Sequence, residues 1–472
     1  MKNSKFNLLI RNGESSLLYN TFTGSISRVS NDLGSFVTVA ERERLGSLPT
    51  KLLSGLEKQG IIVPNDFDEL EEYKKLHELW KAGKEKVEFN VLLTYDCNFE
   101  CPYCYQGRGE KGQQIHGYRY MSEELFEATK KFIKKTTLER QPKTLELVLY
   151  GGEPFLPGAR EMGVNLTEDV SKWAQSNGIS FKLHVLSNGS LIDQSAVEWM
   201  SSFKTRLQIP VDGDPEMHNK YRYDKITKKG SFEDITKVLA MTYGTQIEPH
   251  IRISLTDETY PTMENLLDEL QKRGLDHVYP DFCYITAFTE ACSSFENHTL
   301  PDLKLFKIIP ELWRKAHKRG FPLDIRPRVQ PLPCSSIADG SYIVDPFWEV
   351  YKCWELVGLK EHSVGKIDND GNLNKTSIYG DVLKRNPLEI PACRNHLLLP
   401  SCGGGCVCKA QWNSRTYQAP GCGTEKYLLN DKVKVYVETL NSKPETVEEG
   451  SLKLQLIEGK QEPQMSHCYV LV

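Results

Sequence analysis

Apolar residues recur at two spacings along the chain, and these spacings predict strands and helices in alternation. Six short apolar runs have the length and composition of buried strands, and they lie at 87–94, 145–150, 181–187, 207–211, 250–255 and 277–283. Between the runs, apolar residues return every three or four positions, which predicts helices. Strand-then-helix units in series form a parallel sheet with helices outside it. Because a closed barrel needs about eight such units, we expect an α/β fold with an open, partial (β/α)6 TIM-like barrel over 89–325.

The first 88 residues have a pattern of their own. Apolar runs at 6–10 and 16–20 predict short strands. A helical face is formed by Leu48, Leu52, Leu53 and Leu56. The face of a second predicted helix is formed by Phe67, Leu70, Leu76, Leu79 and Trp80. Short strands together with a few helices predict a small winged-helix-like module at 1–88.

The composition narrows the class of protein. The chain has 472 residues, and a chain of this length usually forms roughly three domains. Its 59 basic and 63 acidic residues give a net charge of −4, without the basic excess of a general nucleic-acid binder. No stretch is long and apolar enough for a transmembrane helix, and the N-terminus lacks the apolar core of a signal peptide. We therefore expect a cytoplasmic protein that binds neither nucleic acid nor membrane.

Cysteine is the residue whose count and clustering are unusual. Thirteen cysteines, an odd number in a chain without an export signal, argue against a disulfide framework. Three lie between 97 and 104, and five lie between 393 and 422. The cysteine-rich segment 326–430 has few apolar faces, so bound clusters would stabilise it. The polar residues 431–472 predict a late hairpin or a loose tail.

The first group of cysteines, Cys97, Cys101 and Cys104, follows directly on the first predicted strand and is followed by Tyr105. Three thiolates hold three irons of a [4Fe–4S] cluster and leave the fourth iron open to a substrate or cofactor. A structural zinc site is the alternative, but it takes four ligands, and no fourth ligand lies close in sequence. Cys-x3-Cys-x2-Cys after a first strand, with an aromatic residue behind it, resembles the radical S-adenosylmethionine (SAM) superfamily. The resemblance implies that this aromatic residue, Tyr105, contacts SAM.

Further motifs of that superfamily follow in the expected order over residues 90–290. The loop Gly151-Gly152-Glu153-Pro154 follows the second strand and resembles the loop that binds the amino group of SAM. Glycines let the backbone approach a ligand closely, and a carboxylate suits an ammonium group. The resemblance implies that the ribose and the carboxylate of SAM are held by Ser187, Asn188, Asp212 and Arg252. Each of these positions also has an ordinary explanation as part of a turn or as a paired core residue.

The later cysteines resemble the SPASM extension of radical SAM enzymes, which binds two auxiliary [4Fe–4S] clusters. The resemblance implies one auxiliary cluster on Cys334, Cys353 and Cys406, and another on Cys393, Cys402 and Cys422. The chain departs from the pattern because His396 stands where the family has a cysteine, Cys408 is additional, and Trp348 replaces a usual glycine. His396 or Cys408 could supply a fourth ligand, since imidazole also binds iron in such centres. A zinc-binding knot over 393–422 is the alternative.

The resemblance also implies an activity. SPASM enzymes mostly modify peptides or proteins, with a 5′-deoxyadenosyl radical from SAM taking a hydrogen atom from carbon. Residues 1–88 resemble winged-helix elements that take up a leader peptide as an added strand, although a cap on the barrel would have the same pattern. We expect a maturase that forms a thioether or other side-chain crosslink in a ribosomally made precursor peptide. The expected cofactors are SAM and three [4Fe–4S] clusters, with an external electron donor such as flavodoxin or ferredoxin.

Two other functions stay open at this point. An anaerobic sulfatase maturase, which oxidises Cys or Ser to formylglycine, carries an aspartate base directly after its equivalent of Cys353. Here Trp354 and Glu355 follow, so Glu355 is the candidate catalytic residue of that alternative. A non-enzymatic iron–sulfur electron carrier would have no use for the SAM-binding motif at 151–154.

Overall fold

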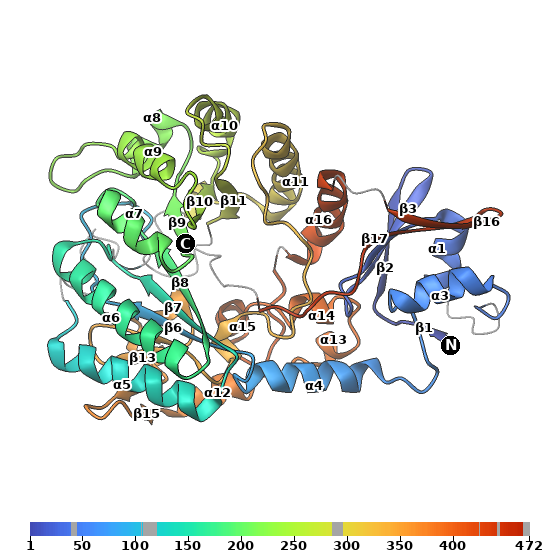
Figure 1. Ribbon diagram of the computed structural model, residues 1–472, viewed down its shortest axis with the longest axis horizontal. Helices are drawn as coiled ribbons and strands as arrows, with labels where there is room; N and C mark the ends of the chain where they lie inside the picture. Colours follow the sequence, from blue (N-terminus) through green and yellow to red (C-terminus); the bar gives the residue numbers. More distant parts are fainter. Residues whose placement is uncertain are drawn as a thin grey trace. The chain divides into compact units, whose positions relative to one another are not determined.

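The computed structural model describes residues 1–38, 45–104, 106, 120–285, 296–423, 425–440 and 444–465 (Figure 1). They form two compact units. The first consists of residues 1–80, 325–334 and 386–466, and the second is built on residues 81–324 and 335–385. The units divide the chain differently from the boundaries expected at 88, 325 and 430, because segments from the last third of the chain pack with the N-terminal residues.

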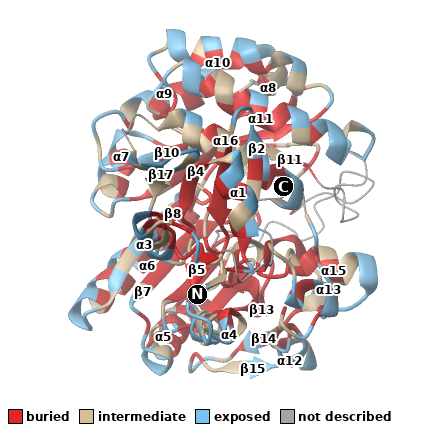
Figure 2. Cartoon of the chain, turned by 90° about the vertical axis from the view of Figure 1, so that its right-hand side faces the viewer, coloured by how far each residue is buried: buried red, intermediate tan, exposed pale blue. Residues whose placement is uncertain are grey.

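The second unit contains a mixed sheet that has ten strands within the described residues. Six of them are parallel and adjacent in chain order: β6 (Lys86–Leu92), β7 (Thr144–Tyr150), β8 (Ser180–Leu186), β9 (Arg206–Pro210), β10 (Glu248–Leu255) and β11 (Tyr279–Tyr284). The six apolar runs predict these strands correctly. Every residue of β6 is buried, which explains why this strand is apolar or paired along its whole length. Figure 2 shows exposed residues mostly on helices such as α9 and α10, while buried residues predominate in the strands around β7.

Helices follow the parallel strands, as the helical spacing predicts. They are α5 (Glu123–Arg140), α6 (Pro157–Ser176), α7 (Gln194–Ser201), α8 (Pro215–Tyr221), α9 (Phe232–Met241), α10 (Met263–Lys272) after the short η1 (Tyr260–Thr262), and α11 (Asp302–Lys318). Three begin at side-chain caps, because Ser122, Asp193 and Asp214 accept hydrogen bonds from backbone N–H groups of the first turn. No helix in the described part of the chain is long and apolar enough to cross a membrane.

The sheet continues beyond β6, which the sequence pattern does not predict. The added strand β12 (Ser341–Val344) is parallel to β6, and antiparallel strands follow as β13 (Glu349–Tyr351), β14 (Gly365–Ile367) and β15 (Leu373–Lys375). Short helices join this region: η3 (Ser335–Ile337), η4 (Trp354–Leu356), η5 (Lys360–His362) and α12 (Ser377–Leu383). Val344 pairs with Val91, so the β12–β13 turn lies at the edge of the sheet where β6 ends.

The first unit contains a second sheet, whose strands lie in the order β16 (Glu445–Glu449), β17 (Leu452–Glu458), β4 (Ile26–Ser30), β3 (Ser15–Asn20) and β2 (Asn7–Asn12). A two-stranded sheet pairs β1 (Lys2–Asn3) with β5 (Ile62–Val63). The helices are α1 (Asn31–Thr38), α3 (Thr50–Lys58), α4 (Glu69–Lys81), α13 (Pro391–Arg394), α14 (Leu399–Cys402), α15 (Val407–Ser414) and α16 (Glu425–Thr439). Strands β2 and β3 are the two predicted N-terminal strands, and β16 and β17 form a late hairpin.

The buried face of helix α4 overlaps the predicted one. Its buried residues are Glu69, Tyr73 and His77, whereas Leu79 is 42 % exposed. The hydroxyl of Tyr73 and Nδ1 of His77 contact the carbonyl oxygen of Pro331 at 3.2 and 2.9 Å. Of the predicted face, Leu70, Leu76 and Trp80 are half-buried, and Leu70 packs against the core that contains Tyr73. The prediction therefore fails at Leu79, which is exposed.

Candidate active site

The three cysteines of the first group lie in the loop after β6, at the carboxyl edge of the parallel strands. They are half-buried, and desolvation raises the pKa of the Cys97 and Cys101 thiols. Nitrogen donors approach both sulfurs. Nδ2 of Asn188 lies 3.6 Å from Sγ of Cys97, and a guanidinium nitrogen of Arg222 lies 3.8 Å from Sγ of Cys101. Tyr105, predicted to contact SAM, lies outside the described residues.

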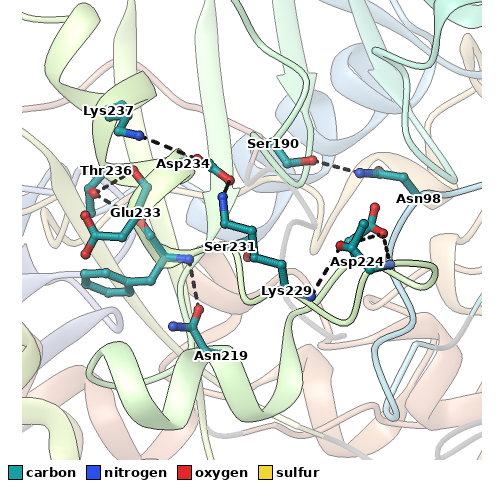
Figure 3. Close-up of polar contacts among 12 residues, drawn as sticks. Asn98, Ser190, Asn219, Asp224, Lys229, Ser231, Glu233, Asp234, Thr236 and Lys237 are labelled. Atoms are coloured by element: carbon teal, nitrogen blue, oxygen red, sulfur yellow. Dashed lines mark hydrogen bonds and ion pairs between the residues drawn. The ribbon is translucent and has the colours of Figure 1, made fainter.

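Two neighbouring segments hold this cysteine loop in place. On one side, Nδ2 of Asn98 donates to Oγ of Ser190 at 2.9 Å, after the end of β8 (Figure 3). On the other side, the loop between α8 and α9 donates a hydrogen bond from the Lys225 backbone to the Asn98 carbonyl at 2.8 Å. The ammonium of Lys225 also pairs with Asp96 at 2.8 Å. The cysteines are therefore anchored through their neighbours Asn98 and Asp96.

The two glycines after β7 are required by close packing within the protein. Gly151 and Gly152 have φ angles of 92° and 52°, in the left-handed region that favours glycine. A Cβ atom on Gly152 would lie 2.1 Å from the backbone oxygen of Asp96, and one on Gly151 would lie 2.4 Å from Cγ of Leu92. The backbone N–H of Glu153 donates to the same Asp96 oxygen at 2.8 Å. The glycines thus bring this loop against the cysteine loop.

The carboxylate of Glu153 joins the ends of β7 and β8. It is fully buried and accepts hydrogen bonds from the Ser187 hydroxyl and the Asn188 backbone at 2.8 Å each, and from the Phe155 backbone at 2.9 Å. Burial raises its pKa to about 7, although the three donors oppose this shift. Ser187, Asn188 and Glu153, which the sequence assigned separately to SAM, therefore form one hydrogen-bonded group.

A buried ion pair lies at the end of β9. Asp212 accepts hydrogen bonds from the Arg222 guanidinium, from the Tyr103 hydroxyl and, at 2.9 Å, from the Ser254 backbone. Burial alone would raise the pKa of Asp212, but the Arg222 charge and these hydrogen bonds hold it below its usual value. Because Tyr103 lies between two cysteines of the loop, the pair links the cluster motif to β9 and β10.

Arg252 lies in β10, two residues before Ser254, so both side chains are on the same face of the strand. Its backbone carbonyl accepts a hydrogen bond from Val211 at 2.8 Å, and the residue is buried. The hydroxyl of Ser254 is buried and has no hydrogen-bond partner among the described residues. An orphaned polar atom beside the Asp212 loop suits a polar ligand such as SAM.

A [4Fe–4S] cluster fits the cysteine loop chemically. Among the described residues, no three His, Cys, Asp or Glu side chains converge on one metal position. In a [4Fe–4S] centre, by contrast, each cysteine binds a different iron atom. Hydrogen bonds to sulfur tune the reduction potential of such centres, and Asn188 and Arg222 are positioned to supply them. Cys97, Cys101 and Cys104 are the residues that would hold the cluster.

Sequence reasoning missed several residues of this site. Arg222, Lys225 and Ser254 belong to no motif, and their contacts are made with segments up to 129 positions away. Gln106, just after the cysteines, also belongs to no recognisable motif. Its Oε1 nevertheless accepts a hydrogen bond from the Gly152 N–H at 2.9 Å. Only the cysteine spacing and the glycine motif are visible in the sequence, because the other residues depend on which loops meet.

The later cysteines are distributed over both compact units. Cys334, Cys393, Cys402, Cys406, Cys408 and Cys422 lie in the first unit, and Cys353 lies in the second. Two glycines bring the cysteine loops of the first unit together, since Gly405 and Gly421 form a β-bridge and a Cβ atom on Gly421 would lie 1.9 Å from the Cys406 oxygen. Cys393 is buried beside Tyr73 and Leu399.

The two remaining candidate ligands have distinct surroundings. Cys408 is buried within α15. Nδ1 of His396 accepts the Leu398 N–H at 3.3 Å, and burial lowers the pKa of the ring. This contact favours the tautomer that carries its proton on Nε2. Binding of iron by His396 would therefore require the hydrogen bond to change.

An aromatic cluster lies beside the cysteine loop in the second unit. The ring of Tyr95, two residues before Cys97, packs 5.8 Å from that of Phe347, and the Tyr95 hydroxyl donates to Asp345 at 3.1 Å. Burial raises the pKa of Asp345 to about 6. Trp354 packs 4.1 Å from Tyr150, and the neighbouring Glu355 is buried. Trp348, in the turn after β12, has a φ angle of 70°, which explains why a glycine is usual there.

Comparisons with known proteins agree with this arrangement. A model of the radical SAM superfamily matches residues 91–270. The chain is 23% identical to a cysteine-type anaerobic sulfatase-maturating enzyme of Clostridium novyi, over 66% of this chain and 85% of that protein. It is also 23% identical to the subtilosin biosynthesis protein AlbA of Bacillus subtilis, over 71% of this chain and 70% of that protein.

A solved structure shows that the fold is shared more widely. Streptococcus suis SuiB, bound to its precursor peptide SuiA, superposes with a TM-score of 0.52 over 90% of this chain and 99% of SuiB, at 12% identity. The fold and the cysteine motif define an α/β enzyme built on a radical SAM domain. The protein is a radical SAM enzyme related to sulfatase-maturating enzymes and to peptide-modifying enzymes, which confirms the resemblance.

Proposed function

We propose that this enzyme modifies a ribosomally made precursor peptide and forms a thioether or other side-chain crosslink. The observation that carries the proposal is the anchored cysteine loop at the carboxyl edge of six parallel strands, next to the glycine motif. The peptide substrate is supported by the relatives, since AlbA is named for bacteriocin biosynthesis and SuiB was solved with a precursor peptide.

The residues of the site have separate roles in this proposal. Cys97, Cys101 and Cys104 hold the SAM-binding cluster, and the loop from Gly151 to Pro154 faces SAM. When bound, the cluster and SAM supply a carbon radical that takes a hydrogen atom from the substrate. The protein keeps the cysteine loop in place through the backbone N–H of Glu153, which donates to the Asp96 carbonyl, and through Asp212, which accepts from the Tyr103 hydroxyl. Tyr105, Ser187, Asn188 and Arg252 stay proposed contacts of SAM.

The proposal assigns a role to each part of the chain. Residues 1–88 act as a winged-helix-like module that recognises a leader peptide, and 89–325 form the radical SAM barrel. Residues 326–430 form a SPASM extension, and 431–472 form a C-terminal tail. The auxiliary clusters are held by Cys334, Cys353 and Cys406 and by Cys393, Cys402 and Cys422, with His396 or Cys408 as a further ligand. The proximity of the Cys406 and Cys422 loops through Gly421 supports a cluster in this region.

The partners follow from the same chemistry. Reductive cleavage of SAM needs one electron, so an external donor such as flavodoxin or ferredoxin is part of the proposal. Thiols that hold clusters persist in a reducing compartment, which supports a cytoplasmic location. No role in binding nucleic acid or membrane is proposed, because the net charge of −4 offers no basic excess.

A second candidate function is the oxidation of Cys or Ser to formylglycine in a sulfatase. The relative from Clostridium novyi is named a cysteine-type anaerobic sulfatase-maturating enzyme, which favours this alternative. Two buried carboxyl groups beside the aromatic cluster, Asp345 and Glu355, could accept the proton that this oxidation releases. The two functions differ in their products, since a thioether joins two residues of the peptide, whereas formylglycine gains an aldehyde that reacts with hydrazides.

The decisive experiment uses the reconstituted enzyme with SAM, dithionite and candidate peptides. We expect 5′-deoxyadenosine and a peptide that has lost hydrogen without gaining an aldehyde. Replacing Cys97, Cys101 and Cys104 together by Ala should abolish 5′-deoxyadenosine formation and leave the auxiliary absorbance. About twelve irons per chain are expected for three clusters. About four would contradict the auxiliary clusters, and undiminished SAM cleavage in the triple variant would contradict the whole assignment.

A further inference from the structure

One strand edge in the first unit is occupied by a segment from the far end of the described chain. Strands β2, β3 and β4 form an antiparallel meander from residues 7 to 30. Strand β17 pairs antiparallel with β4, with Leu454 opposite Val29 and Leu456 opposite Ser27. Without β17, the edge of β4 would present unpaired N–H and C=O groups, which is the template for an added strand.

The groove beside this edge accepts an apolar side chain from β17. Leu454 is fully buried in the core that contains Val29, Leu52 and Leu56, and its neighbours Leu452 and Leu456 pack partly against that core. Space for Leu454 comes from a glycine in α3, because a Cβ atom on Gly55 would lie 2.8 Å from Cδ2 of Leu454. The groove therefore selects apolar residues at alternate positions of an extended segment.

Polar contacts continue beyond the paired strand. Glu458 accepts hydrogen bonds from Arg326 at 2.7 Å and from the Tyr436 hydroxyl at 2.8 Å. Gln461 donates from its backbone to Thr23 and from its side chain to the carbonyl of Gly24, each at 2.7 Å. An occupant of this edge is thus defined by three alternating apolar residues followed by an acidic one.

Most of the present occupant is only partly buried. Leu454 is the one residue of β17 that is fully buried within its described length, and the pairing is irregular between Leu456 and Glu458. Strand β16, the partner of β17 in the hairpin, is exposed at four of its five positions. Segments with few buried apolar contacts open at low free-energy cost compared with the core of a domain.

We propose that the edge of β4 is a binding site for an extended peptide with apolar residues at alternate positions, and that residues 452–458 fill it as an internal ligand which such a peptide replaces. The peptide of this chemistry is the leader segment of the precursor, so the inference rests on the proposed leader-recognition role of residues 1–88. Because the internal strand competes for the edge, the apparent affinity for a leader is its intrinsic affinity multiplied by the fraction of time the edge is open.

The test measures binding to the full-length enzyme without SAM. The probe is a fluorescently labelled synthetic peptide with the sequence of residues 450–465. We expect the Leu454→Ala enzyme to bind this peptide at least tenfold more tightly than the wild type, because its own strand is weakened. Lys453→Ala is the matched control, since Lys453 is exposed on the same strand, and it should leave the affinity unchanged. A probe carrying Leu454→Asp should bind to neither enzyme.

Each contrary outcome has a definite meaning. Equal affinity for wild type and Leu454→Ala, or binding of the Asp probe, would place the peptide elsewhere and overturn the inference. No binding to a folded Leu454→Ala enzyme would show that the strand is a fixed part of the sheet. If that variant fails to fold, amide hydrogen exchange of the wild type decides the question. The amides of β17 should then exchange at least tenfold faster than those of β3. Equal protection of the two strands would refute the displacement of β17. Turnover of a precursor peptide is measured separately, so leader recognition can fail while strand exchange holds.

Discussion

The buried carboxyl of Glu153 makes the stability of this enzyme depend on pH in a predictable way. We consider the variant Glu153→Gln, which keeps the shape of the side chain and removes its titration. In the folded protein, burial raises the pKa of Glu153 from 4.5 to about 7. The folded state therefore holds a proton that the unfolded chain releases above its own pKa.

The sign and size of the effect follow from this difference. Below pH 4.5, both states are protonated, so Glu153 carries no penalty. As the pH rises toward 7, the unfolded state ionises first, and stability is lost. A shift of about 2.5 units corresponds to about 3 kcal/mol in total, of which about 2.5 kcal/mol falls between pH 5 and 8.

The amide of the variant has a cost of its own that does not depend on pH. One carboxylate oxygen accepts the Asn188 N–H, and the other accepts from Phe155 and Ser187. A Gln side chain has only one oxygen, so one of the two backbone N–H groups loses its acceptor, at a cost of about 1–3 kcal/mol. We expect Glu153→Gln to be less stable than the wild type at pH 5 and equal to it or more stable at pH 8.

Urea unfolding followed by circular dichroism at both pH values measures this change. Comparing two proteins prepared identically removes the titration of all other groups. Glu161→Gln, at an exposed position in α6, is the control and should give a difference that does not change with pH. Parallel stability curves for wild type and Glu153→Gln would refute the reasoning, because they would mean that Glu153 has its ordinary pKa in the folded state.

Three further predictions concern single residues. Replacing Arg222 by Gln leaves the buried Asp212 carboxylate unpaired and should cost about 3–5 kcal/mol in urea unfolding at pH 8, with a smaller loss at low pH. Gly152→Ala should lower the thermal midpoint and SAM cleavage together, because its Cβ would lie 2.1 Å from a backbone oxygen. Trp348→Gly relieves a φ of 70° and Lys204→Gly relieves one of 51°. The Trp348 ring is half-buried and Lys204 is exposed. In urea unfolding, the gain in unfolding free energy should therefore be smaller for Trp348→Gly than for Lys204→Gly, and at most about 1 kcal/mol. A larger gain for Trp348→Gly than for Lys204→Gly would mean that the ring contributes no packing.

The sequence by itself determined the parts of this protein that depend on local pattern. Strands β6 to β11 are visible as apolar runs, because a strand buried on both faces needs apolar residues along its length. The position of Cys97, Cys101 and Cys104 follows from the same pattern, since a motif directly after a parallel strand lies at the carboxyl edge of the sheet. The cysteine spacing then indicates the cluster without any knowledge of the neighbouring loops.

Only the tertiary structure decided which distant segments meet. Arg222 and Lys225 reach the cysteine loop because the loop after α8 folds back over it. Strand β17 completes the N-terminal sheet although hundreds of residues separate it from β4. Alternation along a strand sets which side chains face the core, but it carries no information on the partner strand. The apolar pocket beside Gly55 and the backbone edge of β4 exist only after folding, and they determine where residues 452–458 bind.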